Sequence, residues 1–132
     1  MNIYALSSGR GPSGIAIVRV SGKDTLKVCK NLTKLKEINS NQVNYCKFYD
    51  PKNDKIIDPE ALLLWFPGPN SYTGEDLAEF QVHGSNAVIN ALLKTLSEQK
   101  NCRLAEPGEF TKKAFQNDKI DLLKAESVGD LI

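Results

Sequence analysis

The sequence predicts an α+β domain in which helices flank a mixed β-sheet. Segments rich in β-branched and aromatic residues, which favour strands, occur in successive pairs along the chain. Segments with apolar residues at helical spacing lie between and after those pairs. Strand pairs separated by helices are typical of a mixed sheet, and a length of 132 residues suits one domain with its own core.

The first half of the chain is expected to form two strands, a helix and a third strand. Residues 2–6 and 14–20 are strand candidates, and the β-branched density of the second is typical of an inner strand. Residues 23–35 place apolar side chains at helical spacing, with four lysines on a solvated face. Residues 43–49 alternate as a strand, and the turn-forming run 50–54 predicts a hairpin or a surface loop.

The next part of the chain returns to strands and then to a helix. Residues 61–66 are continuously apolar, which favours a central strand, and residues 77–83 alternate as another strand. Residues 85–99 predict a helix with Ser85 as its N-cap. Its apolar stripe is expected to consist of Val88, Ala91, Leu92 and Leu96. A short strand is possible at residues 102–105.

Pro107-Gly108 introduces a further helix near the end of the chain. Glu109 and Lys113 are spaced for an ion pair on this helix, with Phe110 and Ala114 packing inward. Residues 117–121 break the helix, and another begins at Leu122 with no stop signal before the last residue. We therefore expect that final helix to continue in a longer natural chain.

Composition narrows the class of protein. Seventeen basic and sixteen acidic residues leave a net charge of +1, so no field of one sign covers the domain. The three cysteines are odd in number and far apart, which predicts neither a disulfide framework nor a zinc site, and one histidine argues against a structural metal. The N-terminus lacks a signal sequence and the longest apolar run is 61–66, so we expect a cytoplasmic protein with no membrane partner.

The run Gly9-Arg-Gly-Pro-Ser-Gly14 matches the glycine pattern of dinucleotide-binding proteins. That pattern must open a helix that meets the pyrophosphate, whereas here the last glycine opens a β-branched strand. A sharp loop that allows close approach of the backbone is the better interpretation. The phosphate-binding pattern G-x-x-x-x-G-K-[ST] is absent from the sequence, so the chain is not expected to hydrolyse nucleotides by itself.

Residues 77–83 have two different faces. Ala78, Phe80 and Val82 form an apolar face suited to a core, and the other face carries Leu77, Glu79, Gln81 and His83. Gln81 and His83, together with Tyr72 in the preceding turn, are candidate pocket-lining residues. Tyr72 could stack on a planar ligand or pack on the surface, and His83 is more often a hydrogen-bonded residue than a catalytic one. No catalytic residue is predicted.

Arg19 is in phase with Ile15 and Ile17, which places a guanidinium on an apolar face. A charge there requires a carboxylate or a ligand as its partner. Glu79 poses the same problem on its own strand. The two could neutralise one another in the core, or they could form a small-molecule pocket in which the carboxylate accepts two N–H bonds from an aminopyrimidinone edge.

Several long motifs carry a family resemblance. They are Gly9-Arg-Gly with Gly14-Ile, Arg19-Val-Ser-Gly22, residues 64–76, Glu79, His83-Gly84, residues 105–119, and Asp121-Leu with Ala125-Glu126. In this order they resemble the N-terminal part of the tRNA-modification GTPase family MnmE, also called TrmE. The match spans nearly the whole chain.

The resemblance implies a folate-binding and dimerisation domain over residues 1–119, similar to the tetrahydrofolate-binding domain of the glycine-cleavage T protein. Residues 120–132 would begin a helical domain. The ligand would be 5-formyltetrahydrofolate or 5,10-methylenetetrahydrofolate, as the one-carbon source for modifying the wobble uridine of tRNA with the flavoprotein MnmG. The family's folate contacts would fall on Arg19, Glu79 and Lys119.

The resemblance also implies which ligands bind outside this chain, and the chain departs from the family at one loop. GTP, potassium and magnesium would bind in a GTPase domain beyond Ile132. This chain has Pro12-Ser13 where the family has a glycine pair, which bears on the loop near the ligand. One alternative is a purely structural dimerisation module in which Arg19 and Glu79 only pair. A free-standing one-carbon transferase is disfavoured because no acid, base and nucleophile set can be assembled.

Overall fold

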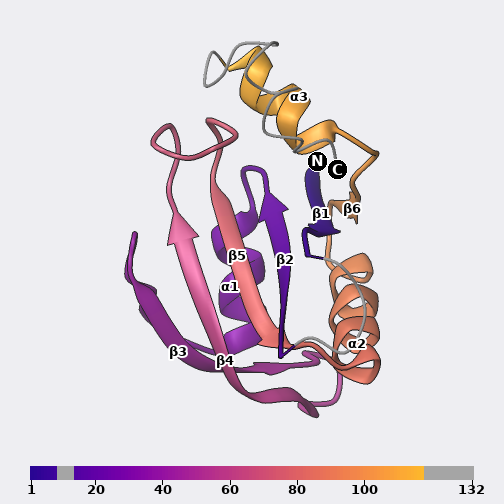
Figure 1. Cartoon of the computed structure of the whole chain (residues 1–132). Helices are drawn as coiled ribbons and strands as arrows, with labels where there is room; N and C mark the ends of the chain where they lie inside the picture. The colour runs from indigo at the N-terminus through magenta and orange to yellow at the C-terminus, as the bar shows by residue number, and fades with distance from the viewer. Residues whose placement is uncertain (9–13, 118–132) are drawn as a thin grey trace.

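The computed structural model describes residues 1–8 and 14–117, and within them six strands form one sheet in the order β3-β4-β5-β2-β1-β6 (Figure 1). The described elements are β1 (Asn2–Leu6), β2 (Ile15–Ser21), α1 (Thr25–Thr33), β3 (Val43–Tyr49), β4 (Ile56–Phe66), β5 (Leu77–His83), α2 (Asn86–Ser97), β6 (Cys102–Leu104) and α3 (Glu109–Gln116). The β1–β6 pair is parallel and the other pairs are antiparallel. The predicted α+β class with a mixed sheet is confirmed. The glycine loop, Lys119 and the last predicted helix lie outside the described residues.

The β3–β4 hairpin resolves one of the alternatives left by the sequence. The N–H of Asp54 donates to the carbonyl of Asp50 at 2.8 Å, and Asp54 adopts a left-handed φ of 59°. β4 starts at Ile56, five residues before the predicted strand at 61–66. Prediction missed this first part because Asp58, Pro59 and Glu60 have low strand propensity.

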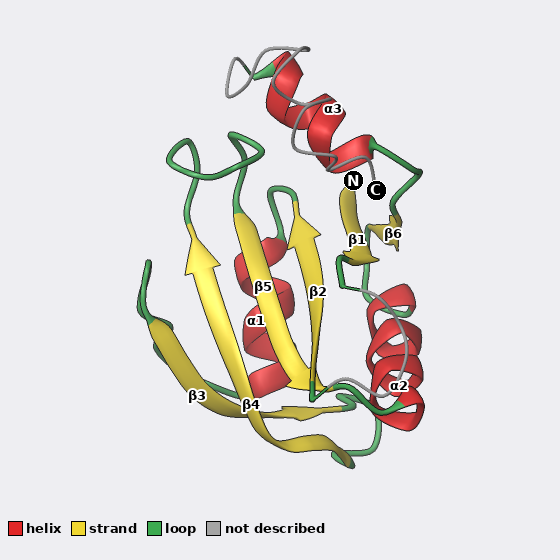
Figure 2. Ribbon diagram, viewed as in Figure 1, coloured by secondary structure: helices red, strands yellow, loops and turns green. Residues whose placement is uncertain are grey.

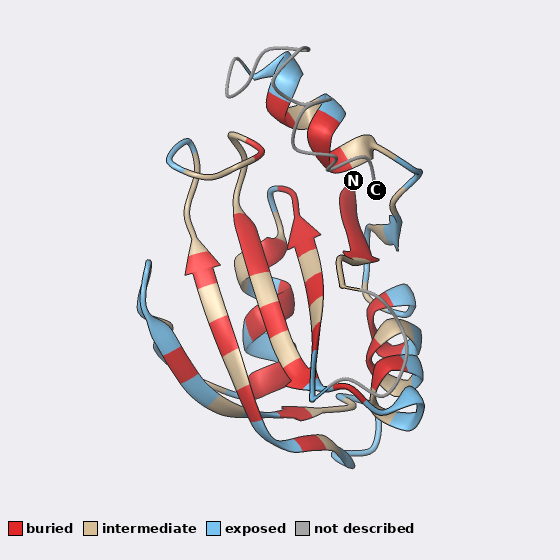
Figure 3. Ribbon diagram, in the orientation of Figure 1, coloured by how far each residue is buried: buried red, intermediate tan, exposed pale blue. Residues whose placement is uncertain are grey.

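The main core lies on one face of the sheet, under α1 and α2. Alternate residues of β2, β4 and β5 are buried together with residues of both helices (Figure 3). The predicted inner face of β5 is confirmed, because Ala78, Phe80 and Val82 are at most 2% exposed. The rings of Phe80 and Phe48 lie 4.8 Å apart between centroids. This packing orients the other face of the same strands outward.

The two core helices begin and end for local reasons. α1 stops before Lys34, whose left-handed conformation (φ 60°) ends the helix, although the predicted range ran to residue 35. Ser85 caps α2 as predicted, since its hydroxyl accepts a hydrogen bond from the N–H of Val88 at 3.2 Å.

The predicted stripe of α2 was partly wrong. Ile89, Leu92, Thr95 and Leu96 are buried, whereas Val88 and Ala91 lie at the margin of the helix–sheet contact.

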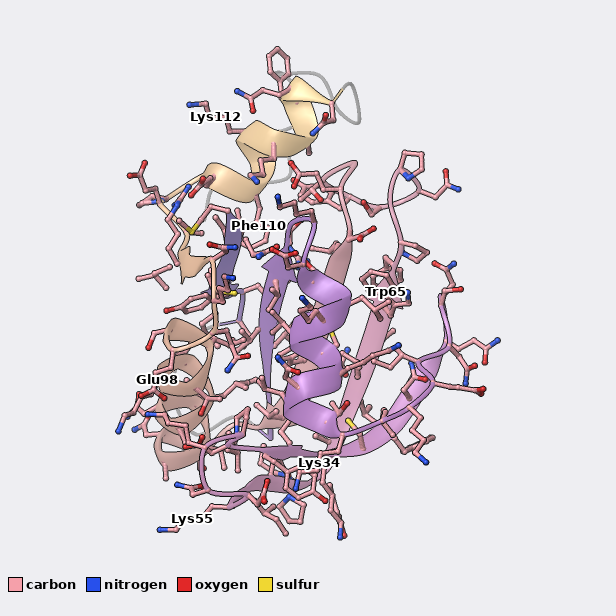
Figure 4. All side chains as sticks on the ribbon, turned by 180° about the vertical axis from the view of Figure 1, so that it is seen from behind. Lys34, Lys55, Trp65, Glu98, Phe110 and Lys112 are labelled. Atoms are coloured by element: carbon pink, nitrogen blue, oxygen red, sulfur yellow. The ribbon has the colours of Figure 1, made fainter. Side chains whose placement is uncertain are left out.

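α3 covers the end of the opposite face. Phe110, labelled in Figure 4, belongs to a second apolar cluster with Ile3, Ala5 and Leu77. The predicted ion pair within α3 was wrong. Arg103 on β6 binds Glu109 through two hydrogen bonds, and Lys113 lies 3.4 Å from the Glu75 carboxylate. Glu109 and Lys113 therefore each hold the helix to another segment.

Within residues 1–8 and 14–117, no helix has the length and apolar character needed to cross a bilayer.

Candidate functional site

The outward side of β2, β4 and β5 forms an open sheet face. We define it by the outward side chains Ile15, Ile17, Arg19, Leu62, Leu64, Glu79, Gln81 and His83, which are half-buried or exposed. Figure 2 shows α1 passing behind β5 and β2, while no helix lies in front of their central part. α3 and the 67–76 loop border one end of this face. The open sheet face is the part of the fold where polar groups gather on a rigid scaffold.

Arg19 and Glu79 face each other across neighbouring strands. They are register partners in the β2–β5 pair, and Arg19 Nε lies 3.4 Å from Glu79 Oε2. Their side chains are 27% and 21% exposed. The expected burial of Arg19 on an apolar face was wrong, because Ile15 is exposed and Ile17 only half-buried. Ion pairs at such partly exposed positions contribute about 1 kcal/mol or less, so stability alone does not account for this one.

Glu79 retains hydrogen-bonding capacity. Its contact with Arg19 is long and uses one oxygen. Among the described residues, the second oxygen, Oε1, accepts no hydrogen bond. An ionised carboxylate offers about four lone-pair positions, so Glu79 can accept two parallel N–H bonds from a planar ligand.

Tyr72 lies beside this pair on the 67–76 loop. Its ring centroid is 5.9 Å from Arg19 Cζ, within the range of a cation–π contact. The Tyr72 hydroxyl is 3.3 Å from Thr111 Oγ1 on α3. A cavity of about 400 Å³ at this place is lined by Phe66, Asn70, Ser71, Tyr72, Leu77 and Glu79. The cavity thus combines an aromatic wall with a carboxylate.

Buried hydrogen bonds fix the 67–76 loop. Thr73, which is fully buried, places its hydroxyl 2.8 Å from that of Ser21 at the end of β2. The Asn117 amide donates to the Thr73 carbonyl at 2.9 Å, and the N–H of Gly68 donates to the Asp76 carboxylate at 2.9 Å. The loop is therefore anchored to both the sheet and the end of α3. Thr73 and Thr111 were not predicted as site residues, because their partners are distant in the chain.

His83 lies at the far end of the open sheet face. Its Nδ1 is 3.0 Å from both carboxylate oxygens of Asp58, and its side chain is 58% exposed. Asp58 is fully buried and also accepts from the N–H groups of His83 and Glu60, at 2.8 and 3.0 Å. The preference for a hydrogen-bonded histidine was correct, but Asp58 was missed. Residues 56–60 were not recognised as part of a strand, so no pattern in the sequence indicated that Asp58 is buried.

Gln81 lies between Glu79 and His83 on β5, opposite Ile17 on one side and Leu62 on the other. It lines a small pocket of about 170 Å³ that also includes His83. The structure thus brings Arg19, Glu79 and Tyr72 together and places Gln81 and His83 further along the same face. Lys119 lies outside the described residues.

Other hollows lack this combination of groups. A groove of about 380 Å³ between the β3–β4 hairpin and α2 contains Lys55 and Lys94. A hollow of about 550 Å³ over β3 and β4 contains Cys46. Burial raises the pKa of Cys46 to about 11, so it carries little thiolate at neutral pH. Among residues 1–8 and 14–117, no three His, Cys, Asp or Glu side chains form a group suited to a metal ion.

Sequence comparisons identify close relatives. The chain is 61% identical over its whole length to the tRNA modification GTPase MnmE of Pelagibacter ubique, covering 30% of that protein. It is 47% identical to the MnmE of Zymomonas mobilis over 98% of the chain and 30% of that protein. The mitochondrial tRNA modification GTPase of Dictyostelium discoideum is 42% identical over 98% of the chain and 26% of that protein. The chain therefore spans less than a third of these relatives.

The family described as the GTP-binding protein TrmE N-terminus matches residues 2–119. That range contains the open sheet face, the 67–76 loop and all three described helices. The chain belongs to this family and is an N-terminal MnmE domain.

Proposed function

We propose that this chain is a tetrahydrofolate-binding and dimerising domain that serves a tRNA-modification GTPase acting on the wobble uridine. The observation that carries the proposal is the half-satisfied Glu79 carboxylate beside Arg19 in the cavity under Tyr72. A reduced pterin presents adjacent N–H donors and a carbonyl on a planar ring. The cavity offers the complementary acceptor and aromatic surface, and Arg19 beside Glu79 and Tyr72 offers the donor.

Each residue has a distinct role in this proposal. Glu79 accepts two N–H bonds from the pterin, and Arg19 donates to its carbonyl or remains paired with Glu79. Tyr72 covers the ring, Gln81 lines the continuing face, and Lys119 adds a positive contact. The ligand is 5-formyltetrahydrofolate or 5,10-methylenetetrahydrofolate, which supplies the one-carbon unit.

The remaining parts of the function belong to the longer protein. The relatives are named as tRNA modification GTPases, and the chain covers 30% or less of those cited. GTP, magnesium and potassium would bind outside this chain. The partners in this proposal are a second copy, the flavoprotein MnmG and tRNA, in the cytoplasm. Apolar side chains on the open sheet face, such as Leu62 and Leu64, support contact with a second copy.

Calorimetry with 5-formyltetrahydrofolate tests the proposal. Glu79→Gln preserves shape but replaces one acceptor oxygen with a donor, so it should weaken binding by about 1–3 kcal/mol, or roughly fivefold to 150-fold. Glu37→Gln is the matched control, because Glu37 is exposed between α1 and β3 and the substitution removes the same charge. Equal affinity of both variants would remove Glu79 from the site.

A structural dimerisation module is the second candidate function. It is favoured by the contact between Arg19 and Glu79 themselves, which needs no ligand. Light scattering that shows a stable dimer, together with no heat of folate binding, would select this alternative. Folate binding that is lost in Glu79→Gln would exclude it.

A further inference from the structure

The Asp58–His83 pair has a defined proton arrangement. Asp58 accepts hydrogen bonds from two backbone N–H groups, so its carboxylate acts as an acceptor. Both its oxygens lie 3.0 Å from His83 Nδ1, which must therefore carry the hydrogen. An imidazole held in this tautomer has its lone pair on Nε2. The buried carboxylate thus fixes both the orientation and the acceptor atom of an exposed ring.

The other ring nitrogen is available for a ligand. Within the described part of the chain, Nε2 of His83 has no hydrogen-bond partner, and the side chain is 58% exposed. The ring lines the pocket of about 170 Å³ with Leu62 and Ile15 as apolar walls and Gln81 and Glu60 as polar ones. A nearby carboxylate disfavours an anionic group, so the pocket suits a neutral hydrogen-bond donor attached to an apolar body.

We propose that His83 Nε2 is the acceptor of a second subsite on the open sheet face, which binds a neutral N–H donor of an extended ligand. Asp58 is a positioning residue that holds the required tautomer. Glu79 and His83 share one face of β5, four residues apart, which corresponds to about 13 Å along a strand. A ligand with its planar ring at Glu79 can therefore reach His83 with an amine or amide N–H further along. This inference rests on the proposed folate function.

The substitution His83→Asn distinguishes the roles of the two ring nitrogens. Its amide nitrogen can occupy the place of Nδ1 and still donate to Asp58, but nothing replaces Nε2. His83→Asn should therefore retain the urea unfolding midpoint while weakening 5-formyltetrahydrofolate binding about fivefold, the effect of one hydrogen bond. Asp58→Asn serves as the second variant, read by ¹⁵N NMR of the imidazole, because it should redistribute the proton between Nδ1 and Nε2.

Modification with diethyl pyrocarbonate gives an independent readout, since His83 is the only histidine in the sequence. The free chain should gain one carbethoxyl group on His83, and saturating 5-formyltetrahydrofolate should slow this reaction about fivefold or more. Suppose that 5-formyltetrahydrofolate binds but does not slow the carbethoxylation of His83, and that His83→Asn binds it with unchanged affinity. This result would overturn the subsite but leave the folate function intact. If the unmodified chain does not bind 5-formyltetrahydrofolate, both the subsite and the folate function are overturned. If ¹⁵N NMR detects the Nε2–H tautomer of His83 in the unsubstituted chain, Asp58 does not hold the proposed tautomer.

Discussion

The hydroxyls of Ser21 and Thr73 are predicted to fasten the loop that carries Tyr72. Both residues are fully buried, and their oxygens lie 2.8 Å apart. Ser21 donates its single hydrogen to the carbonyl of Asp76 at 2.9 Å, so Thr73 is the donor to Ser21. Thr73→Val removes this donor and preserves the shape of the side chain. Ser21→Ala removes the acceptor together with the donor to Asp76, and Thr73→Val also removes an acceptor for the N–H of Glu75.

The expected magnitude follows from these bonds. Each single variant should lower the free energy of unfolding by about 1–2 kcal/mol. A hydrogen bond contributes about 1 kcal/mol net, and the buried hydroxyl that remains loses one of its hydrogen-bond partners. The double variant should lose less than the sum of the single variants, which gives a coupling energy of about 1 kcal/mol. The paired hydroxyls are in direct contact, so additivity is not expected.

Urea unfolding of the four proteins measures this coupling. Trp65 is the only tryptophan of the chain and is 7% exposed, so its fluorescence reports the core. Thr73→Val should also weaken folate binding, because the anchored loop positions Tyr72. A coupling energy below about 0.3 kcal/mol, within the usual error of additivity, would refute the proposed hydroxyl contact.

Three further predictions concern the core, a thiol and an ion pair. Phe80→Ala should cost about 3–5 kcal/mol in urea unfolding, whereas Phe115→Ala, at a position 46% exposed, should change little. Burial raises the pKa of Cys46 to about 11. Its reaction with a disulfide reagent at pH 8 should therefore be much slower in the native chain than in urea. Equal rates under the two conditions would contradict this prediction. A hydrogen bond from Arg103 lowers the pKa of Glu109 from 4.5, so the stability gained from the pair is present above pH 4.5 and is lost as the pH falls. Arg103→Gln should therefore lower the urea midpoint at pH 7, and the difference from the unsubstituted chain should shrink as the pH falls below 4.5. A difference that stays constant with pH would exclude the linkage.

Alternation predicted the two faces of β5 because, apart from Leu77, its polar and apolar residues separate by position. The same rule failed for β2, whose β-branched residues occupy both faces. Arg19 was consequently assigned to a buried face, although the core side consists of Ala16, Val18 and Val20. A strand that is apolar on both faces does not show which one meets the helices until its neighbours are known.

The partners of the site residues were harder to predict than the residues themselves. Glu79 and Arg19 were found because charges inside strands are unusual, and register then made them opposite neighbours. Asp58 and Thr73 act through His83 and Ser21, which are 25 and 52 residues away in the sequence. Such contacts depend on strand register and loop path, which composition and periodicity do not specify.

A map of where the ligand binds tests most directly whether folate occupies the cavity beside Glu79. We propose titrating the ¹⁵N-labelled chain with 5-formyltetrahydrofolate and following the backbone and side-chain signals. We expect the largest shifts at Arg19, Glu79 and Tyr72, on the open sheet face. Shifts confined to the groove near Lys55 and Lys94, with none at Glu79, would contradict this expectation.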